Sequence, residues 1–173
     1  QGDTSTAFAC ALSSFYNKIK VFHIEAGLRT NNIFSPWPEE LNRLYISKIT
    51  SHHFAPTSIA RTNLIKEGVL KKNISVTGNT VIDILFQTLK KINDNTELLF
   101  QYKKKFSFIN NNNFKILLSV HRRENFGSPL KNIFLAINEI SKIKNVQIIY
   151  SGHKNPNVVD AAKKYLRTSK NIL

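Results

Sequence analysis

The sequence predicts an α/β protein in which helices cover parallel β-sheets. Short apolar runs alternate with longer stretches whose apolar residues recur at helical spacing. Such alternation is typical of βαβ units, whose strands run parallel and are buried by helices on their faces. The hydrophobic fraction of 42% is ordinary for a globular protein, so we expect a packed core.

Several helix ends are marked by capping residues. Thr4 and Thr57 stand where a hydroxyl can accept a hydrogen bond from the first free amides, and Gly68 stands where a helix can end. Pro38 fits the first position of a helix. The predicted helices cover about residues 4–16, 38–50, 57–68, 80–92, 96–106, 129–142 and 156–168.

The predicted strands cover about residues 19–23, 52–55, 74–76, 115–120 and 146–150. We expect the first of them, with its apolar residues Ile19, Val21 and Phe22, to be buried. Both chain ends predict incomplete strands, because Gln1–Thr4 resembles a turn after a strand and Asn171–Leu173 resembles the start of one. Parallel strands need neighbours, so we interpret the chain as an internal piece of a longer protein.

The composition limits the class of protein. The net charge is +14, and the first 60 residues hold only five basic and four acidic residues, so most of the excess lies further on. A basic segment can bind an anionic partner such as nucleic acid, but these lysines mostly stand among asparagines, at predicted helix ends and loops without interleaved aromatic residues, so we favour a general compositional bias. No apolar run is long enough to span a bilayer, and no signal peptide is evident. The single cysteine, Cys10, indicates a reducing cytoplasm.

Acidic residues in the first part of the chain stand at strand ends or helix starts. They are Asp3, Glu25, Glu39 and Glu40. Ligands of α/β proteins are held at the ends of strands, so this placement points to proton-transfer chemistry. A helix cap for Asp3, and stabilisation of a first helical turn for Glu39 and Glu40, are the structural alternatives.

Five segments stand in a fixed order along the chain: Gln1-Gly2-Asp3-Thr4, His23–Thr30, Ser35–Glu40, Thr77–Asp83 and His121–Asn125. Together they resemble the non-hydrolysing UDP-N-acetylglucosamine 2-epimerases, and His153–Asn157 continues the resemblance. Gln1, where many relatives have His, and Val120, where Gly or Ala is usual, depart from the family pattern.

The resemblance implies two Rossmann-like domains of the glycosyltransferase B type. Residues 1–80 would be the later part of the first domain, and residues 81–173 the first part of the second. A basic loop before Gln1 and an Asp-Ser-Gly-Gly stretch after Leu173 would complete the site. We therefore expect the isolated piece to be inactive and prone to aggregate.

The resemblance also implies the reaction, which inverts carbon 2 of a UDP-linked 2-acetamido sugar by elimination and re-addition of UDP. It marks Asp3, Glu25 and Glu39 as catalytic carboxylates, with the acid and base roles left open, and His121 as the residue that assists the diphosphate. Arg122, Arg123, His153 and Asn155 would bind the substrate. Arg29 would orient Glu25 or touch phosphate, whereas Glu40 keeps a structural role.

No cofactor or metal is implied, because Gly78-Asn79-Thr80 lacks a dinucleotide glycine pattern and the adjacent His52 and His53 diverge on a strand. The expected partner is UDP-N-acetylglucosamine or a related UDP-sugar, in a homodimer without nucleic acid or membrane. Three alternatives stay open: a sister epimerase for UDP-linked 6-deoxy amino sugars, a basic nucleic-acid-binding module, and a remnant without activity.

Overall fold

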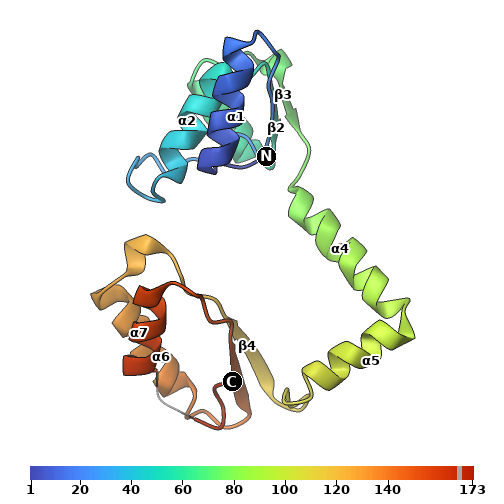
Figure 1. The fold of residues 1–173 in the computed structure, drawn as a ribbon, viewed down its shortest axis with the longest axis vertical. Helices are drawn as coiled ribbons and strands as arrows, with labels where there is room; N and C mark the ends of the chain where they lie inside the picture. The colour runs from blue at the N-terminus through green and yellow to red at the C-terminus, as the bar shows by residue number, and fades with distance from the viewer. Residues whose placement is uncertain (167–168) are drawn as a thin grey trace. The chain divides into compact units, whose positions relative to one another are not determined.

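The protein consists of two compact units, Gln1–Lys91 and Ile92–Leu173 (Figure 1). The structure is a computed structural model that describes residues 1–166 and 169–173. Each unit contains a parallel sheet and helices, so the predicted α/β class is confirmed. The expected boundary at residue 80 lies at the first residue of helix α4 (Thr80–Asn93), and the two units divide near the end of that helix.

The first unit is built on a three-stranded parallel sheet of order β1-β2-β3. Its elements before α4 are α1 (Ser5–Tyr16), β1 (Phe22–Ile24), α2 (Glu39–Ile49), β2 (His52–Ala55), α3 (Ser58–Lys66), the 3-10 helix η1 (Lys71–Asn73) and β3 (Ile74–Val76). In the register of the sheet, His23 pairs with His53 and His53 with Ile74. The side chains of these three residues are buried.

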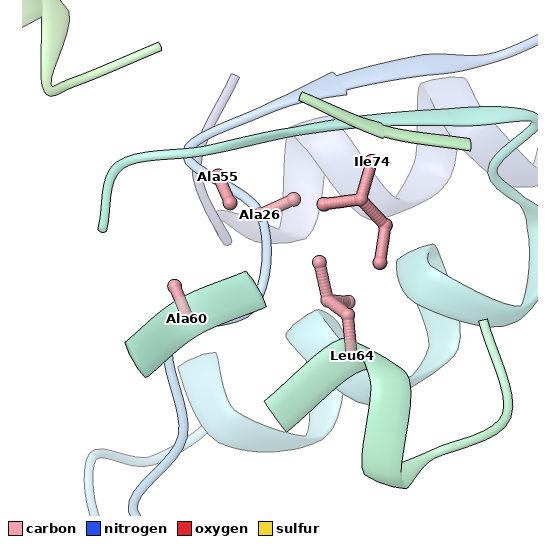
Figure 2. Close-up of a cluster of buried hydrophobic side chains, with 5 residues drawn as sticks. All are labelled: Ala26, Ala55, Ala60, Leu64 and Ile74. Carbon is pink, nitrogen blue, oxygen red and sulfur yellow. The ribbon is translucent and has the colours of Figure 1, made fainter. Parts of the chain in front are cut away.

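The core of the first unit lies between the sheet and α3. It consists of Ala26, Ala55, Ala60, Leu64 and Ile74 (Figure 2). The alanines let α3 approach closely, and Gly27 extends this contact, since a Cβ atom there would lie 2.3 Å from the Ala60 carbonyl oxygen. Thr57 caps α3 by accepting a hydrogen bond from the Ala60 amide at 3.1 Å, as predicted. This packing fixes the segment that follows β1.

Two predictions for the start of the chain need correction. The first strand begins at Phe22, later than predicted, and it is not buried on both faces: Phe22 and Ile24 are 59% and 38% exposed. Within the described residues β1 is an edge strand, so only its His23 face is covered. Pro38 caps α2 and is not its first residue, because its backbone is not helical.

The second unit is built on the parallel pair β4–β5. Its elements are α5 (Thr96–Lys105), β4 (Phe114–Leu118), η2 (Arg123–Asn125), α6 (Ser128–Ile140), β5 (Val146–Tyr150) and α7 (Pro156–Tyr165). Ile172 forms an isolated parallel bridge to Ile148, in the segment for which the sequence predicts the start of a strand. The predicted end of the last helix at Thr168 lies outside the described residues.

The core of the second unit joins α6 and α7 to the strands. It consists of Leu130, Phe134, Ile137, Val146, Ile148 and Val158. This packing sets the loops after β4 and β5 at one edge of the sheet, because parallel strands end on the same side. Over the residues that the structure describes, no helix has the length and apolar character needed to cross a membrane.

Candidate active site

Glu25 marks the carboxyl end of β1 in the first unit. Its backbone has φ +69°, a left-handed conformation that turns the chain sharply out of the strand. The N-terminal segment lies against this turn, since the Gly2 amide donates a hydrogen bond to the Ile24 carbonyl at 3.1 Å. A Cβ atom on Gly2 would lie 3.5 Å from Glu25 Oε2. The structure therefore brings Asp3, the next residue, to the same corner as Glu25.

The Asp3 carboxylate is held by Arg43 of α2. Arg43 Nε and Nη2 both contact Asp3 Oδ2, at 2.8 and 2.7 Å, which leaves Oδ1 without a protein partner among the contacts of the described residues. The neighbouring Asn42 donates to the Asp3 carbonyl at 2.8 Å. Side chains of helix α2 thus hold both the carboxylate and the backbone carbonyl of Asp3. The sequence prediction did not include Arg43. Its position, one helical turn after the start of the helix at Pro38–Glu40, is the feature that could have indicated a role.

Glu40 is buried and structural, as predicted, although it does more than stabilise the first turn of α2. Its Oε1 accepts hydrogen bonds from the amides of Thr30 and Asn31, at 2.9 and 3.0 Å. Its Oε2 is paired with Arg43 Nη1 at 3.0 Å. A buried carboxylate needs such partners, and here they also tie the 30–31 loop to α2.

Glu39 stands beside Glu40 but has a different environment. Its Oε2 is buried without a hydrogen-bond partner, although buried polar atoms in proteins nearly always have one. The structure gives Glu39 no direct contact with Asp3 or Glu25. Its α2 neighbours, however, hold Asp3 from the same helix end.

The loop after β3 completes this corner. Asn79 Nδ2 donates to Glu25 Oε1 at 3.4 Å, and Gln1 Nε2 donates to Thr80 Oγ1 at 3.0 Å. The Thr77–Asp83 segment had been singled out, but no role was predicted for Asn79. Its position in the loop after a parallel strand could have indicated a site residue, because ligands of such sheets are held there. We call Asp3, Glu25, Arg43 and Asn79 the acidic corner.

The environment of Arg29 differs from the one that the sequence predicted. Its guanidinium was expected to orient Glu25 or touch phosphate, but its side chain is only 2% exposed and is paired with Glu67 Oε1 at 2.6 Å. The same group donates to Glu67 Oε2 and to Ser47 Oγ, both at 2.8 Å. These bonds point the guanidinium into the protein, so Arg29 fastens the end of α3 to α2.

Two buried histidines are neighbours in the sheet. His23 of β1 and His53 of β2 pair in the register and are 3% and 1% exposed. Burial lowers the pKa of His23, and burial, followed by the nearby His23 imidazole, lowers the pKa of His53 to about 4. His52 points to the other face and contacts Ser75 Oγ at 3.0 Å. Both buried rings are therefore neutral at pH 7.

The second unit places three predicted residues together at its sheet edge. The rings of His121, after β4, and His153, after β5, stack with centroids 5.0 Å apart and planes 12° apart. The Asn155 amide donates to His153 Nδ1 at 3.1 Å, and the Asn155 side chain caps α7 by accepting from the Asn157 amide. Arg122 and Arg123 are exposed beside this pair, at the start of η2. We call His121, His153 and Asn155 the histidine corner.

No group of three or more His, Cys, Asp or Glu side chains among the described residues is arranged to hold a metal ion. Each unit places polar side chains at the carboxyl ends of parallel strands, and the fold is of the α/β, glycosyltransferase B-like class. Residues 1–173 match the sequence model of one protein family, which is described as UDP-N-acetylglucosamine 2-epimerase. The chain belongs to this family.

Solved structures agree with this family. The chain is similar to the UDP-GlcNAc 2-epimerase from Neisseria meningitidis bound to UDP-GlcNAc, with a TM-score of 0.94 and 45% identity over 99% of this chain and 46% of that one. It is also similar to the Methanocaldococcus jannaschii enzyme in complex with UDP-GlcNAc and UDP, with a TM-score of 0.76 and 36% identity, covering 99% of this chain and 47% of that one.

Sequence relatives give the same result. The UDP-N-acetylglucosamine 2-epimerase of Campylobacter jejuni is 48% identical over 177 residues, which cover 99% of this chain and 46% of the relative. The corresponding Yersinia pestis protein is 42% identical over 173 residues, with the same coverage. The chain therefore spans about half the length of the curated relatives that it matches.

Proposed function

We propose that the protein containing this chain is a UDP-N-acetylglucosamine 2-epimerase, which interconverts UDP-N-acetylglucosamine and UDP-N-acetylmannosamine. The observation that carries the proposal is the convergence of Asp3 and Glu25 on one corner of the sheet, in a chain of this family. The Neisseria relative bound to UDP-GlcNAc supports the choice of substrate class.

The C2 hydrogen of the sugar is not next to a carbonyl, so direct deprotonation is unfavourable. The proposed route removes the C2 proton to a carboxylate while the C1–O bond breaks, UDP leaves with the bonding electrons, and a C1=C2 double bond forms. UDP oxygen then re-forms the bond to C1, and C2 takes a proton on its opposite face. The steps are redox-neutral, so the proposal requires no nicotinamide.

The acidic corner supplies groups suited to these proton transfers. Because Arg43 engages only Oδ2 of Asp3, the Oδ1 atom remains available to a substrate. Asn79 orients Glu25 through Oε1. The unpartnered Oε2 of Glu39 supports a third carboxylate role, because a bound ligand could supply the missing hydrogen bond. We assign the proton transfers to these three carboxylates together, without dividing the acid and base steps between them.

The histidine corner is proposed to serve the diphosphate. The His121 ring is exposed and is braced by the His153 ring, so it can donate a hydrogen bond to a phosphate oxygen without losing its position. Arg122 and Arg123 add positive charge beside it. Arg122, Arg123, His153 and Asn155 therefore remain the proposed substrate-binding residues, whereas Arg29 is withdrawn because Glu67 and Ser47 engage it.

The location and the assembly belong to the same proposal. We infer that the protein acts in the cytoplasm, which its single cysteine favours, and that it works as a homodimer. Size-exclusion chromatography with light scattering measures the assembly directly. A monomer at micromolar concentration that turns over substrate would contradict it.

The test is C2 exchange in deuterated water. The complete protein in which residues 1–173 occur is incubated with UDP-N-acetylglucosamine, and proton NMR follows the C2 signal and the appearance of the manno epimer. Deuterium should enter C2 of both sugars. A folded protein that leaves C2 protonated, and forms no epimer, contradicts the proposal.

The same preparation distinguishes the other functions. A UDP-linked 6-deoxy amino sugar, offered in parallel, should exchange more slowly than UDP-N-acetylglucosamine if the proposal is right. Filter binding to a nucleic acid over a salt series tests the charge-based alternative, for which micromolar affinity with a steep salt dependence is the diagnostic result.

A further inference from the structure

His23 belongs to the segment that marks the family, yet it is not one of the proposed catalytic or substrate-binding residues. It is the middle residue of β1, is 3% exposed, and does not belong to the acidic corner. Its ring nevertheless contacts the residue before Asp3, because His23 Nε2 lies 2.8 Å from the Gly2 carbonyl oxygen.

The partners of the ring determine where its proton is. A carbonyl oxygen can only accept a hydrogen bond, so Nε2 carries the proton and donates it to Gly2. The other ring nitrogen, Nδ1, is buried without a partner. Burial lowers the pKa of His23, which agrees with a neutral ring in this single tautomer.

Gly2 is consequently fastened to β1 at both of its backbone polar groups. Its carbonyl accepts from His23, and its amide donates to the Ile24 carbonyl at 3.1 Å. It adopts φ +73°, which a residue with a side chain rarely does, and this turn leads directly into Asp3. Gly2 also lies beside Glu25 Oε2. Gly2 therefore connects the two carboxylates: it directly precedes Asp3 in the chain, and it lies beside the carboxylate of Glu25.

We propose that His23 is a positioning residue for the proposed reaction: its Nε2–H group holds the Gly2 carbonyl and so fixes Asp3 relative to Glu25. The inference rests on the proposed function for its catalytic consequence, but the hydrogen bond itself can be tested separately. In the proposed arrangement His23 touches no substrate and acts only through Gly2.

The neighbouring histidine supplies a matched control. His53 pairs with His23 in the sheet and is as deeply buried, but among the described residues its Nδ1 has no hydrogen-bond partner and its ring makes no hydrogen bond to Gly2. Replacing either ring removes a buried imidazole from the same layer. Only replacement of His23 removes the bond to Gly2.

The kinetic experiment compares His23→Leu, His23→Gln and His53→Leu in the complete protein. His23→Leu should lower the rate of C2 deuterium exchange by about tenfold to a hundredfold, because small displacements of catalytic groups cost that much. KM for UDP-N-acetylglucosamine should change by less than about threefold, as expected when an interaction needed in the transition state is lost. His23→Gln, whose amide nitrogen can donate from nearly the same place, should recover most of the rate, and His53→Leu should keep it.

A second readout does not depend on activity. Amide hydrogen exchange of Gly2, followed by NMR without ligand, should be accelerated by at least about tenfold in His23→Leu and unchanged in His23→Gln and His53→Leu. If the unmodified protein shows no C2 exchange, the proposed function fails, and the amide measurement still decides whether His23 holds Gly2.

Three results would overturn the inference. One is a His23→Leu protein with the original exchange rates at C2 and at the Gly2 amide. Another is a His53→Leu protein that loses C2 exchange as severely as His23→Leu. Should His23→Leu not fold, nitrogen-15 NMR of the imidazole in the unmodified protein decides: a proton on Nδ1 in place of Nε2 contradicts the bond to Gly2.

Discussion

Arg43 holds Asp3 through two contacts to the same carboxylate oxygen, at 2.8 and 2.7 Å, from a position 40 residues further along the chain. The same guanidinium contacts the buried Glu40 at 3.0 Å. One cation therefore serves both a proposed catalytic carboxylate and a structural one. This shared arginine links the stability of the first unit to the geometry of the acidic corner.

Replacement of Arg43 should destabilise the protein. Arg43→Met leaves the Glu40 carboxylate, which is 1% exposed, without its counter-charge, and we expect a loss of about 3 kcal/mol in the free energy of unfolding. Arg43→Lys should lose less, because it keeps the charge. Urea denaturation measures both values.

Lys142→Met is the control for Arg43, because Lys142 and Glu139 form an exposed pair with the same helical spacing. Its cost should be below about 1 kcal/mol. Equal losses for Arg43→Met and Lys142→Met would show that the buried pair has no special importance.

The carboxylates of the acidic corner should be essential for exchange at C2. Asp3→Asn and Glu25→Gln keep the shape of each side chain but remove its capacity to take a proton, so each should reduce deuterium incorporation by at least about a hundredfold. Near-UV circular dichroism checks that the fold is retained. Glu97→Gln, on the exposed surface of α5, is the control and should exchange normally. A folded Asp3→Asn protein with normal exchange would remove Asp3 from the mechanism.

Gly27 and Gly68 allow the energetic cost of a steric clash to be separated from the cost of a strained backbone. Both have φ near +90°, but a Cβ atom at Gly27 would lie 2.3 Å from the Ala60 carbonyl oxygen, whereas a Cβ atom at Gly68 meets nothing within 4 Å. Gly68→Ala should cost about 1–2 kcal/mol from the left-handed backbone alone. Gly27→Ala should cost about 3 kcal/mol or more, since the clash with α3 is added. Thermal or urea unfolding decides, and similar costs at the two sites would contradict the packing argument.

Acid should destabilise the first unit through His53. Its pKa is about 4 in the folded protein and 6.5 when unfolded, so below pH 6.5 the unfolded chain binds the proton first. The stability present at pH 7 is therefore lost as the pH falls, by about 2 kcal/mol from His53 at pH 5. Nearby His23, His52 and Arg29 act in the same direction as burial, and Glu67 opposes them.

Urea unfolding at pH 7 and pH 5 measures this loss. His53→Leu should show a smaller difference between the two pH values, with the remainder due to groups such as His23, whose pKa is also lowered. A His53→Leu protein with the full pH dependence of the original would assign the effect elsewhere.

The histidine corner should bind the diphosphate of UDP. His121→Asn removes the imidazole proposed to contact phosphate and should weaken UDP binding by about tenfold, as expected for the loss of a hydrogen bond to a charged group. His153→Phe keeps a ring to stack on His121 and should weaken binding less than His153→Ala does. Isothermal titration calorimetry with UDP gives the three affinities. Unchanged affinity in His121→Asn would contradict this role.

The local sequence was sufficient for most elements. Strands 52–55, 74–76 and 146–150 were predicted at their observed bounds, because short segments between clear turn and helix signals leave little choice. The caps at Thr4 and Thr57 were also correct, since a capping hydroxyl acts on amides two or three residues away. The family motifs contain three of the four residues of the acidic corner, Asp3, Glu25 and Asn79, but not Arg43.

What the tertiary structure alone decided are the partners across long sequence separations. Arg29 pairs with Glu67, Arg43 with Asp3, and His23 with Gly2, at separations of 38, 40 and 21 residues. A charged or polar side chain in a sequence has many possible partners, and only the packing of helices on the sheet selects one. For that reason the sequence could mark Asp3 and Glu25 as candidates, but it could not predict that Glu67 engages Arg29, that Arg43 holds Asp3 or that His23 bonds to Gly2.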